Sequence, residues 1–244
     1  MYSTKIDGET LEFGTSGLLY RSNKLMYDRG TETLWRQFTG EPVVGELVGS
    51  GIKLEVLPVL LTTWGDWLAM HPDTTVLDAD TGLYPAGLYV PEWDPQSIYY
   101  SLRQQPETSF PVWRKDDRLP EKSEVLGLVI NGEARAYPAD TLREQPVLND
   151  SLGGLGLVVI TPGDGAGARA FQSDGQRFVM VYLTGSNAAT VVVVDEDGEE
   201  WQMGEDALIK TSDPAQRLDR LPSHVAYWFG WYGFHDETGV YGQN

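Results

Sequence analysis

The chain has 244 residues, of which 41% are hydrophobic and 22% charged, a composition typical of a globular protein and not of a disordered or fibrous one. Its 36 Asp and Glu against 18 Lys and Arg give a net charge of -18, which makes nucleic acid and anionic membranes poor partners. The absence of cysteine excludes a disulfide, a thiolate metal site and a thiol nucleophile within these residues, and no apolar run is long enough for a membrane span.

The first part of the chain predicts short strands and one short helix. Strands are expected at residues 11–13, 25–27 and 53–57, with a turn around Gly30 that joins residues 26–28 to residues 34–35. Further on, Trp64, Trp67 and His71 have the spacing i, i+3 and i+7, which places them on one face of a helix that Pro72 ends.

Residues 80–123 contain six prolines and no periodicity, so they are predicted to form a linker or a long surface loop. After them, residues 125–130 and 134–137 flank Asn131-Gly132, the signature of a β-hairpin with a type I′ turn. A short helix is expected at 140–144, a strand at 155–160 and a hairpin around the acidic turn 195–198. Near the end, His224, Trp228, Trp231 and His235 predict a last helix with one aromatic face.

Two segments of the chain repeat each other. At an offset of 164 residues, eight identical residues fall within a window of 24, far above the one or two (roughly) that ordinary composition gives. The identical positions include the pairs Trp64/Trp228, Trp67/Trp231 and His71/His235. We therefore expect two copies of one ancestral unit.

The predicted fold is a β-rich α+β protein of two repeat-related units with short Trp-bearing helices. The first unit spans residues 1–79, the irregular linker residues 80–123, and the second unit residues 124–244. The second unit has about 45 residues, from the hairpin at 125–137 to the strand at 155–160, for which the first unit has no counterpart. A unit without these elements exposes unpaired strand edges. The first unit is thus expected to lack its amino-terminal third.

Motifs that carry chemistry are few. The acidic turn 195–200 lacks the ligand spacing of a calcium loop, and the glycine-rich stretches lack the Lys-Ser/Thr of a phosphate loop. We therefore predict no metal and no cofactor in this chain. His71 and His235 each close a helix, where a histidine can cap free carbonyls and interact favourably with the helix dipole. A structural role is expected for both, with catalysis by His71 as the weaker alternative.

Residues 10–29 resemble the signature of the domain-of-unknown-function family DUF3179. The resemblance extends over nearly the whole chain, and includes residues 117–120, 132–138 and 147–150. Members of this family are often exported or lipid-anchored, and often carry a Cys-Pro-Leu-Cys-like motif ahead of the stretch that matches Met1. Some are described as selenoproteins at that motif.

The resemblance implies a thiol- or selenol-based redox or metal-handling protein of the cell envelope, whose Cys-x-x-Cys or Cys-x-x-selenocysteine motif lies upstream of Met1. The signature then places Ser16, Tyr27, Asp28, Arg29 and Trp35 nearest that motif, with Arg29 suited to lower the pKa of a thiol. The simpler interpretation is that Asp28 and Arg29 fasten a hairpin. We also expect an in-frame coding segment before Met1, because a selenocysteine codon read as a stop would give a gene that restarts there.

The alternative function is a non-catalytic binding or structural module for a peptide or glycan. It would use the groove between the two units or the exposed aromatic residues of the linker, Trp93 and Trp113. The sequence does not decide between an enzyme and such a module, and it does not identify a small-molecule or protein partner.

Overall fold

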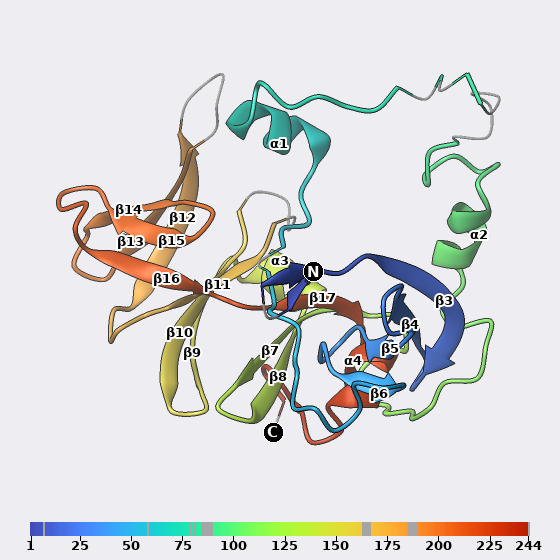
Figure 1. Cartoon of the computed structure of the whole chain (residues 1–244). Coiled ribbons are helices and arrows are strands. Elements are labelled where there is room, and N and C mark those ends of the chain that lie inside the picture. The colour runs from blue at the N-terminus through green and yellow to red at the C-terminus, as the bar shows by residue number, and fades with distance from the viewer. Residues whose placement is uncertain are drawn as a thin grey trace.

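The fold of the chain was obtained as a computed structural model, and it is β-rich with short helices, as expected (Figure 1). The structure describes residues 1–6, 8–57, 59–78, 80, 82–83, 90–162, 167–184 and 190–243. Within these residues, no helix has the length and the apolar character needed to cross a membrane.

The largest element is an antiparallel sheet in the order β12-β13-β14-β15-β16-β11-β10-β9, which curls into a barrel. Asn149 closes it, since its Nδ2 donates to the Phe178 carbonyl at 2.7 Å and its Oδ1 accepts from the Phe178 amide at 2.9 Å. Side chains alternate between the two faces of each strand, so Val158 and Ile160 point into the barrel while Leu157 and Val159 pack outside it. The strands are β9 (Val147–Leu152), β10 (Leu155–Ile160), β11 (Arg169–Gln172), β12 (Phe178–Thr184), β13 (Thr190–Asp195), β14 (Glu200–Met203), β15 (Ala207–Lys210) and β16 (Arg217–Leu221).

A second sheet supports the last helix. Its order is β17 (His224–Tyr227), β7 (Glu124–Ile130), β8 (Glu133–Pro138) and β18 (Gly239–Val240), and α3 (Ala139–Glu144) follows β8. The predicted hairpin is confirmed, because Asn131 and Gly132 have φ angles of 50° and 86°, as a type I′ turn requires. Helix α4 (Trp228–Phe234) buries Trp228 and Trp231 against this sheet, in one cluster with Val125 and Ala136.

The amino-terminal part forms a smaller sheet in the order β3 (Phe13–Tyr20), β4 (Asn23–Asp28), β5 (Leu34–Arg36) and β6 (Pro42–Val44). Strands β1 (Lys5–Ile6) and β2 (Glu9–Thr10) pair beside it. The strand predicted at 53–57 is only partly formed, because it is held by a single bridge between Tyr2 and Val56.

Helix α1 (Trp64–Met70) confirms the predicted helix that ends before Pro72. Two other predictions were wrong. His224 belongs to β17 and not to the last helix, because its strand pairs with β7 and the helix begins only at Trp228. The supposedly irregular linker contains α2 (Ile98–Gln104), whose first turn is capped by Ser97 Oγ accepting from the Tyr99 amide at 3.2 Å.

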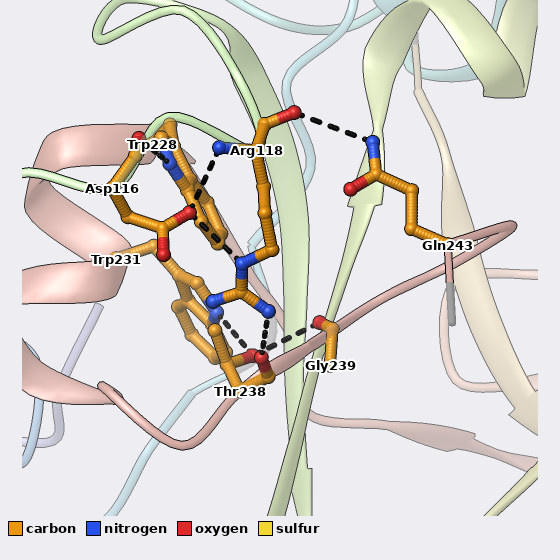
Figure 2. A network of polar contacts seen from close by, with 7 residues as sticks. All are labelled: Asp116, Arg118, Trp228, Trp231, Thr238, Gly239 and Gln243. Atoms are coloured by element: carbon orange, nitrogen blue, oxygen red, sulfur yellow. Dashed lines mark hydrogen bonds and ion pairs between the residues drawn. The ribbon is translucent and has the colours of Figure 1, made fainter.

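The end of the linker is attached to α4, as Figure 2 shows. Trp228 Nε1 donates to the Asp116 carbonyl at 3.0 Å, and Arg118 Nη1 donates to the Thr238 carbonyl at 2.8 Å. The Arg118 guanidinium also lies 5.3 Å from the centre of the Trp228 ring and 2.9 Å from Asp116 Oδ1. One cation thus joins the linker, the helix and the turn that follows it.

The amino-terminal sheet packs on the opposite side of α4. Phe38 stacks on Phe234 with ring centres 4.8 Å apart, and Arg21 Nη1 donates to the Gly233 carbonyl at 3.5 Å. A side chain at Gly233 would place its Cβ 3.1 Å from the Arg21 carbonyl oxygen, so glycine permits this close approach.

Candidate functional site

Most of the predicted site residues come together on three neighbouring strands. Ser16 lies in β3, Tyr27 and Asp28 in β4, and Trp35 in β5, while Arg29 follows β4 directly. His71 is separate from them, because it follows α1, which stands apart from this sheet in Figure 1.

Asp28 is fully buried and surrounded by donors. Its Oδ1 accepts from the Thr31 amide at 2.6 Å, and its Oδ2 accepts from Trp35 Nε1 at 2.9 Å and from the Thr31 hydroxyl at 2.9 Å. Burial alone raises the pKa of Asp28, but the hydrogen bonds from Thr31, Trp35 and Gly30 outweigh it and hold the pKa below its usual value. Asp28 is therefore an anion whose oxygens are already occupied in fixing the β4–β5 hairpin.

Arg29 stays at the surface. Its Nε lies 2.8 Å from Glu12 Oε1, its amide donates to the Glu12 carbonyl at 2.9 Å, and its guanidinium lies 5.5 Å from the centre of the Tyr27 ring. These contacts support the interpretation that Asp28 and Arg29 fasten the hairpin. They also leave the Arg29 cation half exposed, where it can face an anionic group.

The Ser16 hydroxyl is used by the backbone. It donates to the Leu25 carbonyl at 2.8 Å and accepts from the Leu18 amide at 3.1 Å, at the bulge where β3 slips in register. This hydrogen bond to a carbonyl directs the hydroxyl proton away from any general base.

His71 and His235 both follow a helix, as predicted. Their backbone amides, and not Nε2 of the imidazoles, make the capping bonds, to the carbonyls of Trp67 at 2.8 Å and Trp231 at 3.0 Å. Each imidazole instead lies against that tryptophan, with ring centres 4.0 and 4.2 Å apart, and its buried Nε2 has no hydrogen-bond partner. Across the described part of the chain, no group of three or more His, Asp or Glu is arranged to hold a metal ion.

Sequence reasoning missed an apolar pocket of about 340 Å³ at the amino terminus, here called the Met1 pocket. The signature stretch 10–29 contributes two of its walls, Phe13 and Met26. Tyr2 closes one side, donating from its hydroxyl to the Gln37 carbonyl at 2.7 Å, and burial together with the nearby Glu41 raises the pKa of Tyr2 to about 12. The lining residues are Met1, Tyr2, Ser3, Thr4, Phe13, Met26, Gln37 and Leu54.

The arrangement around Asp28 recurs at the large barrel. Trp201 Nε1 donates to Asp195 Oδ2 at 2.9 Å, the same distance as between Trp35 and Asp28. Phe178 meets the Trp201 ring edge-on with centres 5.8 Å apart, as Phe13 meets the Trp35 ring at 5.9 Å. Sequence comparison had aligned the two tryptophans but had not found their aspartates.

The two tryptophan helices also make matching contacts, but in different surroundings. Trp67 Nε1 donates to Thr74 Oγ1 at 3.0 Å, and Trp231 Nε1 donates to Thr238 Oγ1 at 2.9 Å. The preceding tryptophans differ, since Trp228 is 1% exposed under the Arg118 guanidinium whereas Trp64 is 50% exposed. Helix α1 therefore carries a face that α4 covers.

Other residues of the resemblance meet between β8 and β9. Arg135 Nη1 reaches both oxygens of Asp150 at 2.7 and 2.6 Å, and the hydroxyl of the fully buried Tyr137 donates to Asp150 Oδ2 at 2.8 Å. This charge-assisted cluster joins the hairpin sheet to the barrel.

Comparison with known proteins gives a family. No curated protein and no solved structure matches the chain. The sequence profile described as Protein of unknown function (DUF3179) matches residues 1–238, nearly the full length. The chain therefore belongs to the DUF3179 family, whose function is unknown.

Proposed function

We propose that this chain is the scaffold of a thiol- or selenol-based redox or metal-handling protein of the cell envelope. Its reactive motif, Cys-x-x-Cys or Cys-x-x-selenocysteine, lies on the amino-terminal side of Met1. The observation that carries the proposal is the Met1 pocket. Phe13 and Met26, from the stretch by which the family is recognised, line this pocket together with residues 1–4, so a group carried just before Met1 lies beside the signature.

The proposal includes a duplication, with units at 1–79 and 124–244 and a linker at 80–123. Its best support is a pair of equivalent ion pairs with exchanged charges. Arg29 pairs with Glu12 at 2.8 Å, and Glu196 pairs with Arg177 at 3.4 Å. In both cases the residue after the buried aspartate donates its amide to its partner's carbonyl at 2.9 Å. A coincidence of sequence would not reproduce backbone and side-chain contacts together.

The chemistry requires two soft groups separated by two residues. In a redox role the two groups lose two electrons and two protons as they form a disulfide or selenenylsulfide, and a substrate disulfide takes up both to give two thiols. In a metal role the same two deprotonated groups bind a soft cation. Arg29, half exposed in the signature, supports the thiolate form in either case.

The test uses the polypeptide extended upstream of Met1. We expect reactive thiols or selenol by titration, together with a bound soft metal or turnover of a disulfide or peroxide. An extended protein that reacts with no thiol reagent, binds no metal and turns over no disulfide or peroxide would overturn the proposal. The upstream DNA gives a second test, because the proposal requires an open frame through a Cys codon, with a single TGA if the motif contains selenocysteine. Several closely spaced stops, or a ribosome-binding site directly before Met1, would contradict it.

A second candidate is a binding module for a peptide or glycan, which the aromatic residues of the linker favour. Trp93 and Trp113 are 80% and 60% exposed, and a cavity of about 850 Å³ separates part of the linker from the second unit, with Tyr227 and Tyr241 in its lining. Exposed aromatic side chains offer flat surfaces for sugars or peptide side chains. Binding of a glycan or peptide by the present chain that is lost in Trp93→Ala or Trp113→Ala would favour this function.

A further inference from the structure

We infer that the first unit binds a β-hairpin in its open side, as β9 and β10 close the barrel of the second unit. The inference rests on the proposed function, because the hairpin is assigned to the segment placed there before Met1. It identifies the occupant of the Met1 pocket as a pair of strands.

The second unit shows what such a hairpin does. Strand β10 pairs with β11 and brings Val158 opposite Phe171, so that Val158 and Ile160 fill the barrel between Phe171 and Phe178. Strand β9 follows at the outer edge, where Asn149 binds both backbone groups of Phe178. These two strands complete the core around Trp201.

The first unit has the matching strands up to that point. Residues 1–3 pair with residues 55–57, through Ser3 N to the Glu55 carbonyl and Leu57 N to the Met1 carbonyl, both at 2.9 Å. Tyr2 thus lies opposite Val56 as Phe171 lies opposite Arg220, and Val56 and Arg220 are 164 residues apart. Residues 1–3 therefore correspond to β11, the strand on which β10 lies.

The Met1 pocket corresponds to the space that β10 fills. Phe13 lies opposite Asp28 as Phe178 lies opposite Asp195, and Met26 lies opposite Trp35 as Val193 lies opposite Trp201. The counterparts Phe178 and Val193 are both in the core that Val158 and Ile160 complete. The pocket at Phe13 and Met26 is the same core without those two side chains.

The chemistry of the occupant follows from these walls. Its inner strand adds to the edge of residues 1–3 through main-chain hydrogen bonds, which bind a strand regardless of sequence. Its inward side chains are branched and apolar, because the pocket is lined by Phe13, Met26 and Leu54. A second copy of the chain cannot offer its own β9 and β10 without opening its barrel, since Asn149 and the core hold them.

The experiment supplies such a hairpin from the chain itself. A copy of residues 146–161 is fused ahead of Met1 through a flexible linker, because an isolated hairpin is marginally stable in water and a tether raises its effective concentration. The matched control carries Val158→Asp and Ile160→Asp in the fused copy only. Backbone hydrogen exchange at residues 1–3 and 13–20, the melting temperature and the sedimentation behaviour are compared with those of the parent chain.

We expect exchange at residues 1–3 to slow about tenfold or more in the hairpin fusion, and the melting temperature to rise by about 4 °C. The aspartate control should match the parent. The free hairpin peptide at millimolar concentration, added to the parent chain, should give the same protection in part. Equal exchange in both fusions and with the peptide, or a parent dimer that already protects residues 1–3, would overturn the inference. Because the fused hairpin contains no cysteine, this result is independent of whether the redox proposal holds.

Discussion

The indole Nε1 of Trp35 donates a 2.9 Å hydrogen bond to the carboxylate of Asp28, and both side chains are fully buried. An ionised carboxylate is costly to bury unless donors surround it. Trp35 supplies one of those donors and also fills the core beside Phe13, so a single residue joins electrostatic and apolar stabilisation of the β4–β5 hairpin.

The first prediction concerns this pair. Trp35→Phe retains the ring but removes the donor, so the free energy of unfolding should fall by about 2–3 kcal/mol, the range for a hydrogen bond to a buried charge. Urea denaturation measures the change. Trp93→Phe is the control, because Trp93 is 80% exposed and its replacement should change stability by less than about 0.5 kcal/mol. Equal stabilities of the two variants would show that the bond contributes nothing.

Local sequence signals predicted the elements that local chemistry specifies. Asn131-Gly132 predicted a type I′ hairpin because few other residues tolerate two successive positive φ angles. The spacing of Trp64 and Trp67 predicted α1 because one helical face carries both. The turn near Gly30 and the strands around it were predicted for the same kind of reason.

Contacts between distant residues could not be predicted in this way. The stripe from His224 to His235 suits a helix, but pairing with β7 places His224 in a strand instead. Nothing local to Asn149 indicates that it closes a barrel by binding the backbone of Phe178, 29 residues away. The Met1 pocket was likewise missed, since its walls come from four separate segments.

The second prediction concerns pH. Burial, with smaller contributions from His224 and Lys53, lowers the pKa of His235 to about 4, against 6.5 in an unfolded chain. Between these values the unfolded state binds a proton that the folded state does not, so stability is complete above pH 6.5 and falls as the pH decreases towards 4. Because the imidazole is partly exposed, we expect a loss of about 1–2 kcal/mol from this group.

Urea denaturation of the parent and of His235→Asn at pH 7.0, 6.0 and 5.0 measures this loss. The difference in stability between the two proteins should change in favour of the variant as the pH falls. His224, whose pKa burial also lowers, is present in both proteins and so leaves a residual slope in the variant. A difference independent of pH would contradict the assignment.

The third prediction concerns Arg118. Arg118→Lys keeps the charge but loses the planar group that lies over Trp228 while donating to Asp116 and the Thr238 carbonyl (Figure 2). We expect stability to fall by about 1–2 kcal/mol and the near-ultraviolet circular dichroism of tryptophan to change. Arg103→Lys is the matched control, because Arg103 makes an exposed ion pair with Glu92 that should contribute little. An unchanged tryptophan signal in Arg118→Lys would mean that the linker end does not fix α4.

The last prediction tests the packing of α4 on its hairpin. A Cβ at Gly127 in β7 would lie 2.3 Å from the Trp231 ring, in a core where neither the strand nor the buried indole can move away easily. Gly127→Ala should therefore lower the free energy of unfolding by about 2–3 kcal/mol through overpacking, and shift Trp231 fluorescence as the ring is displaced. Gly239→Ala is the control, because it is also a strand glycine but its Cβ would meet its nearest atom, Arg135 Nε, at an ordinary 3.6 Å. Stability should then differ between the two variants although both add one methyl group to the same sheet. If Gly127→Ala is as stable as Gly239→Ala, the indole of Trp231 does not lie against β7, and the contrast between the covered helix α4 and the exposed helix α1 loses its basis.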